Sequence, residues 1–130
     1  MWLEAFSDNL DSSGIRLPLT RNAEHCWLSD WEPLVGLLKD KSLSLGTRSA
    51  SFHTSLAMTL VDQAQQIRTE RGDFAVGLTG GVFQNKYLTE LTMSLLQDEG
   101  FKVYVPEQIP GNDAGLSFGQ IIEVAMSSYR

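Results

Sequence analysis

A long amphipathic helix is the clearest element that the pattern of hydrophobic and polar positions predicts. It runs from about Thr47 to Glu70 and ends before Gly72. Its apolar residues recur at helical spacing and form one stripe, while the glutamines and Arg68 lie largely away from it. The stripe consists of Phe52, Leu56, Leu60, Ala64 and Ile67.

A strand, a second long helix and another strand follow. Residues Phe74 to Thr79 alternate large apolar residues with small ones, which is the period of a strand. Residues Val82 to Glu99 have helical periodicity and end before Gly100, and Phe101 to Val105 predicts the second strand. A crossover of this length implies that the two strands are parallel and that their connection is right-handed. The sequence therefore predicts an α/β class, helix-rich, with a short parallel β-α-β unit.

The N-terminal part of the chain has weaker patterns. Residues Trp2 to Leu10 favour a short helix, and Ile15 to Leu28 are expected to be irregular. Residues 1–30 are therefore interpreted as an irregular and short-helical N-terminal segment. Ser29 or Asp30 is expected to cap a helix that continues through residue 39, because Pro33 is tolerated in a first helical turn but not in a helix interior. A turn over residues 41–46 then leads to the long helix.

Two parallel strands make a poor domain when they stand alone. Parallel strands are normally buried on both faces within a larger sheet. The chain has several helices but only two convincing strands, at residues 74–79 and 101–105. We therefore expect residues 1–130 to form a single domain fragment, one subdomain of a larger α/β fold.

Composition and charge narrow the possible functions. The 130 residues are 42% hydrophobic and 20% charged, which is typical of a globular protein. A net charge of −6 argues against nucleic-acid binding and against binding to an anionic membrane. No apolar run has membrane-spanning length, and the N-terminus lacks the pattern of a secretory signal. Cys26 is the single cysteine, so we expect a reducing, cytoplasmic location.

Two short motifs carry the candidate chemistry. Gly80 and Gly81 stand between a predicted strand and a predicted helix, where backbone N–H groups can approach an anion at the positive helix end. Asn112 and Asp113 follow a loop from Pro106 to Gly111 and begin the last predicted helix, over residues 113–126. An aspartate in this position can cap its helix or hold a cation. Together the motifs predict two walls of one cleft for a nucleotide and a metal ion.

Each candidate residue also has a simpler interpretation. The glycine pair can be only a tight turn, because it lacks the Lys-Ser/Thr of a P-loop. Asn85 is acceptable in a first helical turn for local reasons, and Asp113 can be only a helix cap. His53 is expected to be a packed or hydrogen-bonded structural histidine. His25 and Cys26 form one isolated pair, which is a weak indication of a metal or nucleophilic site.

Four motifs occur in a fixed order along the chain. They are Trp31-Glu32-Pro33-Leu34, Phe52-His53-x-x-Leu56-Ala57, the run TGGVFQNK from Thr79 to Lys86, and the run PGNDAGLSFGQ from Pro110 to Gln120. This set resembles the C-terminal end of the HypF family of hydrogenase-maturation carbamoyltransferases, from at least Trp31 onward. The departures are small, because Thr79 stands where the family has Ser and Ala114 where it has Gly.

The resemblance implies a partial actin-like ATPase (RNase H-like) fold, the C-terminal subdomain of a threonylcarbamoyl-transferase-like domain. The whole enzyme of this family uses ATP and carbamoyl phosphate to make carbamoyl-adenylate. It then carbamoylates the C-terminal cysteine of the partner protein HypE. The remaining domains of the same protein would be further partners, and the isolated fragment is expected to be inactive.

Site residues are carried over by motif only. The resemblance implies a nucleotide site of Gly80, Gly81, Gln84, Asn85, Asn112 and Gly115. It implies Asp113 as one ligand of a divalent metal, zinc or iron, whose other ligands lie outside this chain. No residue of the fragment is assigned as catalytic.

Two other functions stay open at this point. One is a different enzyme of the same superfamily, such as the tRNA threonylcarbamoyl transferase or a sugar kinase. The residues of the runs Val-Phe-Gln-Asn and Asn-Asp-x-Gly-Leu disfavour such an enzyme, and the acidic net charge disfavours tRNA as a substrate. The other is a non-enzymatic half-domain that only completes an interface.

Overall fold

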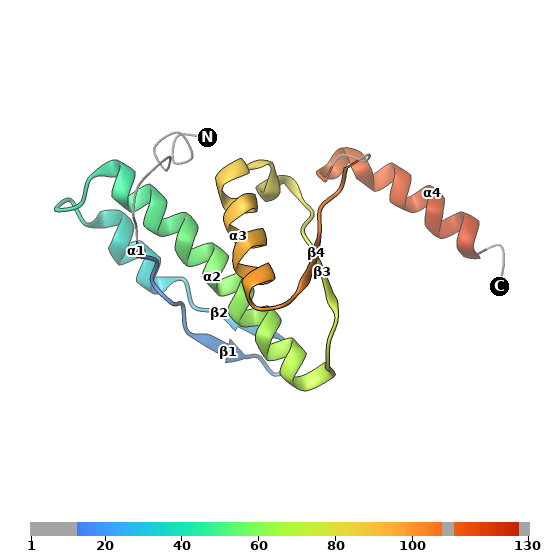
Figure 1. Cartoon of the computed structure of the whole chain (residues 1–130), viewed down its shortest axis with the longest axis horizontal. Helices are drawn as coiled ribbons and strands as arrows, with labels where there is room; N and C mark the ends of the chain where they lie inside the picture. The colour runs from blue at the N-terminus through green and yellow to red at the C-terminus, as the bar shows by residue number, and fades with distance from the viewer. Residues whose placement is uncertain (1–12, 108–110, 128–130) are drawn as a thin grey trace.

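The chain folds around one long helix, α2, as a computed structural model shows for residues 13–107 and 111–127 (Figure 1). Helix α2 spans Leu45–Arg71, which is 27 residues. It begins at Leu45 rather than Thr47 because Ser44 is the N-cap, with its hydroxyl accepting a hydrogen bond from the Thr47 N–H at 3.0 Å. The predicted helix is confirmed, and it ends before Gly72 as expected.

The buried face of α2 differs from the predicted stripe. Ala64 is buried, but the other stripe residues are only half-buried. The residues that are fully covered are mostly small or polar: Ser49, Ala50, Ser51, His53, Ser55, Ala57, Thr59, Val61 and Ala64. Small residues are buried here because α2 is covered from more than one side. Helix α3 packs on it, as does α1, and the segment near Gly14 and Ile15 approaches its backbone.

The parallel β-α-β unit is confirmed. Strands β3 (Ala75–Gly77) and β4 (Lys102–Tyr104) are parallel, with Val76 opposite Val103. Helix α3 (Lys86–Asp98) connects them and lies against α2 (Figure 1). The core is a cluster of buried apolar residues from α2, α3 and the ends of the two strands: Val61, Ala64, Leu78, Leu96 and Phe101.

Helix α3 begins later than the hydrophobic pattern predicts. Residues Gly81–Gln84 form a 3-10 turn, and Asn85 is the N-cap of α3. The Asn85 side-chain oxygen accepts a hydrogen bond from the Leu88 N–H at 2.9 Å. Asn favours this cap position because its oxygen replaces a missing helical acceptor. The predicted start at Val82 therefore counted the 3-10 turn as α-helix.

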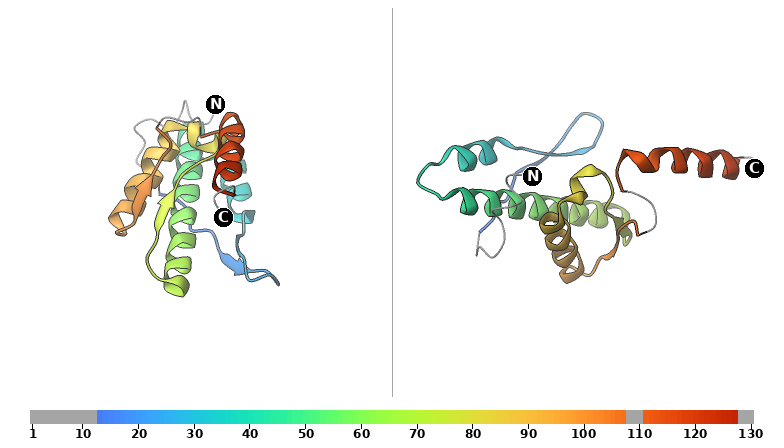
Figure 2. Two further views of the ribbon diagram at one scale, coloured as in Figure 1. Left: turned by 90° about the vertical axis from the view of Figure 1, so that its right-hand side faces the viewer. Right: turned by 90° about the horizontal axis from the view of Figure 1, so that it is seen from above.

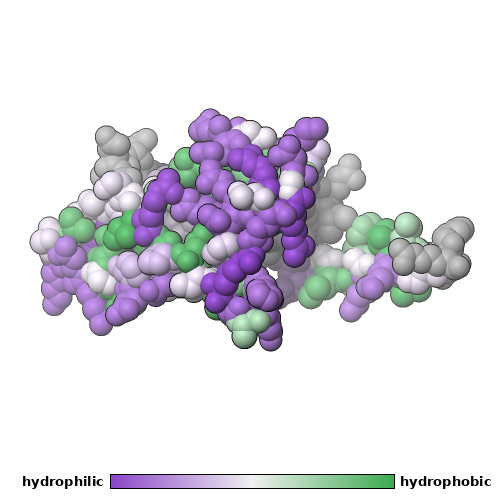
Figure 3. Space-filling model, turned by 90° about the horizontal axis from the view of Figure 1, so that it is seen from below, coloured by the Kyte–Doolittle hydropathy of each residue, from purple (hydrophilic) through white to green (hydrophobic). Residues whose placement is uncertain are grey.

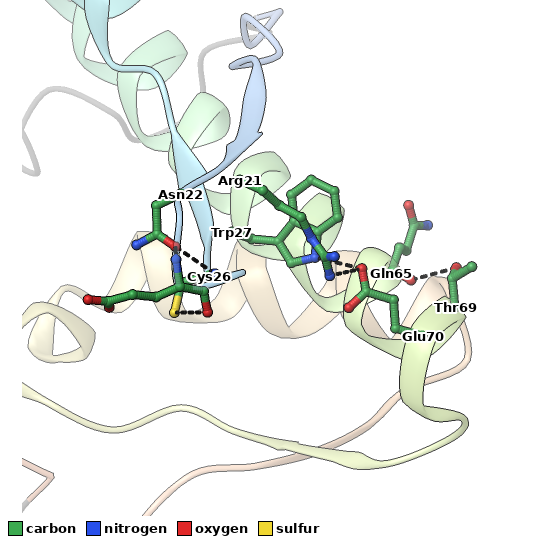
Figure 4. Close-up of polar contacts among 8 residues, drawn as sticks. Arg21, Asn22, Cys26, Trp27, Gln65, Thr69 and Glu70 are labelled. Carbon is green, nitrogen blue, oxygen red and sulfur yellow. Dashed lines mark hydrogen bonds and ion pairs between the residues drawn. The ribbon is translucent and has the colours of Figure 1, made fainter.

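The prediction of an irregular segment from Ile15 to Leu28 is wrong in part. Strands β1 (Leu19–Arg21) and β2 (Trp27–Ser29) form an antiparallel hairpin. The Asn22 side chain builds its turn by accepting hydrogen bonds from the N–H groups of Glu24 and Cys26 (Figure 4). The strands have three residues each, which is too short for a period-2 pattern to be visible. The predicted helix over Trp2 to Leu10 lies outside the described residues.

The hairpin is held to the end of α2 by polar and aromatic contacts. Arg21 forms an ion pair with Glu70, and the Trp27 indole N–H donates to the same carboxylate at 3.2 Å (Figure 4). The Arg21 guanidinium also lies 4.6 Å from the centre of the Trp27 ring. These contacts join residues far apart in the sequence, so local patterning does not reveal them.

Helix α1 (Glu32–Lys39) packs on α2 and buries Leu34. Pro33 lies in its first turn as predicted, but Trp31 is the N-cap. Asp30 contributes in another way, because its carboxylate accepts a hydrogen bond from the Glu32 N–H at 2.9 Å.

Helix α4 (Leu116–Ser127) projects away from the rest of the molecule (Figures 1 and 2). It buries none of its residues, although many are apolar. Figure 3 shows hydrophobic residues gathered on this projecting part. The exposed apolar side chains are Leu116, Phe118, Ile121, Ile122, Val124 and Met126. None of the helices in the described ranges is both long and apolar enough to cross a membrane.

The close approach of Gly14 to α2 gives a stability prediction. A Cβ at Gly14 would lie 2.8 Å from the Thr54 methyl and 3.0 Å from the Ser55 nitrogen, so Gly14→Ala forces a shift. We expect it to lower the free energy of unfolding by about 1–3 kcal/mol, as overpacking does. A Cβ at Gly36 in α1 meets nothing within 4 Å, so Gly36→Ala is the matched control. It should raise stability by up to about 1 kcal/mol. Urea unfolding of both variants checks this, and equal stabilities would contradict the packing described.

The uncovered surfaces give a second prediction. Apolar helix faces and open strand edges favour association. We expect the isolated 130-residue chain to self-associate, or to show rapid amide exchange in β3 or β4. Replacing Ile121 and Val124 by lysine should reduce the association, because both side chains are exposed on α4. Sedimentation velocity and hydrogen exchange measure the two effects. A monomer with well-protected strands would show that the chain is an autonomous domain.

Candidate functional site

The loops that follow β3 and β4 meet at one end of the parallel strands. The Gly80 N–H and the Thr79 hydroxyl both donate to the Gly111 carbonyl, the latter at 3.3 Å. Just before this point, the Leu78 N–H donates to the Tyr104 carbonyl at 2.9 Å and continues the ladder. Carboxyl ends of neighbouring parallel strands share one edge, which is where α/β proteins place their ligands. The two sequence motifs are therefore brought together.

Gly80 is required by its backbone conformation. Its φ is +105°, a region that other residues rarely adopt. A Cβ there would meet nothing within 4 Å, so the requirement is conformational and not steric. Because the Gly80 N–H already binds Gly111, it is not available to a ligand. The first N–H groups of the following 3-10 turn have no acceptor within the turn and are the donors that remain.

A cavity of about 670 Å³ lies between the two motifs. This volume is in the range of small-molecule sites. Four of the predicted site residues line it: Gly80, Asn112, Asp113 and Gly115. Thr79, Pro106 and residues of α4, including Gln120 and Glu123, complete the wall.

The other predicted residues lie elsewhere on the turn. Gln84 lines a smaller neighbouring cavity of about 120 Å³, together with Gly80 and Thr89. Gly81 and Asn85 are not among the residues that line either cavity. Val82 and Phe83 face a third space, an apolar groove of about 480 Å³ shared with Trp31, Leu56 and Leu60. Two residues of the predicted apolar stripe of α2, Leu56 and Leu60, therefore line this groove.

The cap of the last helical segment is Asn112 and not Asp113. The Asn112 side-chain oxygen accepts a hydrogen bond from the Ala114 N–H at 3.0 Å. Asp113 is the first residue of the 3-10 turn Asp113–Gly115 that precedes α4, and it is exposed. The interpretation of Asp113 as a helix cap is therefore wrong, and its carboxylate is left at the cavity.

The charges around the larger cavity are negative. Asp113 and Glu123 line it, and no lysine or arginine is among its described lining residues. A free phosphate would be repelled by two carboxylates, whereas a cation or a hydroxyl group would be attracted. This site can accept an anion only through backbone N–H groups or together with a cation.

Asn85 is turned toward α2. Its Nδ2 lies 2.8 Å from His53 Nε2, and its Oδ1 caps α3 at Leu88. The Thr89 hydroxyl lies 2.8 Å from the carbonyls of both Phe83 and Asn85 and so closes the turn from the other side. His53 is 4% exposed, and its Nδ1 lies 2.8 Å from the Ser49 carbonyl. The expectation of a packed, hydrogen-bonded histidine is confirmed, but its partner Asn85 was missed.

The described residues contain no group of three or more His, Cys, Asp or Glu side chains that could hold a metal. His25 and Cys26 lie in the hairpin turn, where Cys26 is exposed and its N–H donates to Asn22 at 2.8 Å (Figure 4). Asp113 alone cannot bind a divalent ion tightly. Any metal at this cavity would need ligands beyond those described here.

The fold and the site define the class: part of an α/β domain with a ligand-sized cavity at the carboxyl ends of two parallel strands. The chain belongs to the carbamoyltransferase family. The family model described as "Carbamoyltransferase, Kae1-like Domain, second subdomain" matches residues 1–120. The predicted membership of the HypF family is thereby confirmed.

Similar proteins agree with this family. The chain is 36% identical to carbamoyltransferase HypF of Synechocystis over 107 residues, which is 81% of this chain and 13% of that protein. It is 37% identical to carbamoyltransferase HypF of Rhodobacter capsulatus over 75 residues, which is 58% of this chain and 10% of that protein. The chain thus spans only a small part of the length of the relatives it matches.

Solved structures show the same fold. The crystal structure of full-length HypF in the phosphate- and nucleotide-bound form aligns with a TM-score of 0.81 and 31% identity, over 91% of this chain and 16% of that one. HypF of T. kodakarensis aligns with a TM-score of 0.75 over 98% of this chain and 17% of that one. At 20% identity the second likeness concerns the fold alone. The predicted partial actin-like ATPase (RNase H-like) fold, helix-rich with a short parallel β-α-β unit, is confirmed.

Proposed function

We propose that this chain forms the C-terminal part of a nucleotide site in a carbamoyltransferase that acts in hydrogenase maturation. The whole protein uses ATP and carbamoyl phosphate to form carbamoyl-adenylate and transfers the carbamoyl group to the C-terminal cysteine of HypE. The single observation that carries the proposal is the joining of the two motif loops at one cavity, through the bond from Gly80 to Gly111.

Two features of the cavity and one related structure support a nucleotide as the ligand. Its volume of about 670 Å³ suits a small molecule. Its polar groups include Asn112, Gln120 and Glu123, which can accept hydrogen bonds from ribose hydroxyls. A relative of this chain, at 31% identity, was crystallised with phosphate and nucleotide bound.

The phosphate end of the ligand needs a cation. Asp113 is exposed on the cavity. It would supply one oxygen ligand, and the remaining ligands would come from other parts of the whole protein. A divalent ion held there would act as a Lewis acid on a phosphoryl or carbamoyl oxygen.

The described residues at the cavity do not form a nucleophile and base pair. Their side chains are carboxylates, amides, one hydroxyl and apolar groups. We infer that this part binds and orients the adenylate, while the activated carbamoyl group and the acceptor thiolate come from outside the chain. The isolated chain is then inactive as an enzyme.

The exposed apolar surface of α4 supports an interface with the remaining domains of the same protein. Helix α4 buries none of its residues and borders the cavity through Phe118, Gly119 and Gln120. We infer that the remaining domains of the same protein cover it, because apolar patches of this kind mark interfaces. HypE would then meet the completed cleft. The exposed Cys26, which forms no disulfide, favours the cytoplasm as the compartment.

Nucleotide titration of the isolated chain tests the site. We expect ATP or AMP to shift the backbone amides of residues 79–85 and 112–115 in heteronuclear NMR spectra. With part of the cleft missing, the Kd should be on the order of millimolar, or about −4 kcal/mol. Shifts confined to the β1–β2 hairpin and α1 would contradict the assignment, since these elements do not line the cavity.

Substitution of Asp113 tests the metal ligand. In the full-length protein, Asp113→Asn should weaken metal binding and abolish carbamoyl transfer to HypE, because one charged ligand is lost. Stability should change little, since Asn112 and not Asp113 makes the capping bond. Metal content and transfer of a labelled carbamoyl group are the two measurements.

Asp73→Asn is the matched control for that experiment. It makes the same chemical change at an exposed carboxylate that is not among the residues lining the cavity, so transfer should be unchanged. Undiminished transfer by the Asp113→Asn protein would remove Asp113 from the mechanism.

A further inference from the structure

His53 connects the long helix to the glycine-rich turn. It lies in α2, and its buried ring makes T-shaped contacts with the rings of Phe52 and Tyr87, whose centres lie 5.6 and 5.8 Å away. His53 is not among the residues lining the two cavities at the strand ends. Its Nε2 nevertheless contacts Asn85, the residue that ends the 3-10 turn after Gly80.

The positions of the hydrogen atoms between His53 and Asn85 follow from the Ser49 carbonyl, which can only accept a hydrogen bond. The Ser49 carbonyl lies 2.8 Å from His53 Nδ1, so Nδ1 must carry a proton. In a neutral ring Nε2 is then an acceptor, and the Asn85 NH₂ group donates to it at 2.8 Å. The Asn85 oxygen is left facing the Leu88 N–H at 2.9 Å, which is the cap of α3. In this series of hydrogen bonds, which links Ser49, His53, Asn85 and Leu88, each group is either a donor or an acceptor without conflict.

We propose that His53 is a positioning residue: as the neutral Nδ1–H tautomer it fixes the Asn85 carboxamide, and thereby the path of the Gly80–Asn85 turn, whose Gly80 lines the cavity. If Nε2 carried the proton instead, two donors would face each other. Asn85 would then have to turn its amide around and give up the Leu88 cap, or lose the contact with His53. The ring therefore selects one orientation of Asn85 and one path of the turn.

The consequence for the ligand is preorganisation. The turn carries at its start N–H groups that have no acceptor within the turn, and it ends at Asn85. If the turn already has the backbone conformation that it adopts with a ligand, less conformational entropy is lost on binding. This inference rests on the proposed nucleotide site, so the test below includes a measurement that needs no nucleotide.

Two amide substitutions of His53 separate positioning from packing. Both His53→Gln and His53→Asn remove the aromatic edge contacts with Phe52 and Tyr87, so their packing losses are similar in kind. The glutamine amide reaches the position of Nε2 and can accept from Asn85. The asparagine amide reaches only the position of Nδ1, so it can still donate to Ser49 but not meet Asn85.

We expect the His53→Gln chain to bind AMP with nearly the wild-type Kd and the His53→Asn chain to bind it about tenfold more weakly, which is the effect of one ordinary hydrogen bond. Amide exchange at Leu88 and at residues 81–84 should increase in the His53→Asn chain and not in the His53→Gln chain. Thermal unfolding of both variants records the general packing loss. Equal exchange and equal Kd in the two variants would overturn the proposal and leave His53 as a core residue.

A measurement on the unsubstituted chain covers the case in which a variant does not fold. The ¹⁵N shifts of the His53 ring distinguish a protonated Nδ1 from a protonated Nε2. The Nδ1–H tautomer is expected, and an Nε2–H tautomer would overturn the proposal. If AMP does not bind the unsubstituted chain, the proposed nucleotide site loses its support, while the exchange and ring measurements still decide the role of His53.

Discussion

Helix α3 packs against the middle of α2, and this contact supports both the core and the site. Val61 and Ala64 of α2 meet Leu96 of α3, and Leu78 and Phe101 close the cluster from the strands. Apolar burial of this kind is the main favourable term in folding. Because α3 lies between β3 and β4 in the sequence, its docking on α2 also decides where the ends of both strands come to lie.

The candidate site depends on that docking in two places. At the start of the turn, the hydrogen bond from the Gly80 N–H to the Gly111 carbonyl joins the loops after β3 and β4. At the end of the turn, Asn85 is held by its hydrogen bond to His53 of α2 and by the cap it makes at Leu88. The turn between them is therefore fixed at both ends by groups that lie on other elements. Gly80, at its start, lines the cavity.

The uncovered surfaces agree with the small share of its relatives that the chain spans. Within residues 13–107 and 111–127, the two parallel strands have no further strand beside them, an apolar groove lies beside α2, and α4 is apolar and exposed. All three are surfaces that a larger domain would cover. The acidic cavity fits the same picture. Asp113 and Glu123 face it without a described basic side chain to balance them, so its ligand requires a cation or further groups from elsewhere.

Local sequence was enough to predict the long helix, the parallel β-α-β unit and the two motifs, because helical periodicity, strand alternation and glycine turns are properties of neighbouring residues. The family motifs led to the cavity residues Gly80, Asn112, Asp113 and Gly115. Local sequence could not place the β1–β2 hairpin, whose three-residue strands are held to Glu70 by Arg21 and Trp27. It also could not reveal that Asn85 faces His53, 32 residues away in the sequence. Only the tertiary structure decides such contacts, because a hydrogen bond between distant residues depends on how the helices pack and leaves no periodic signal in the chain.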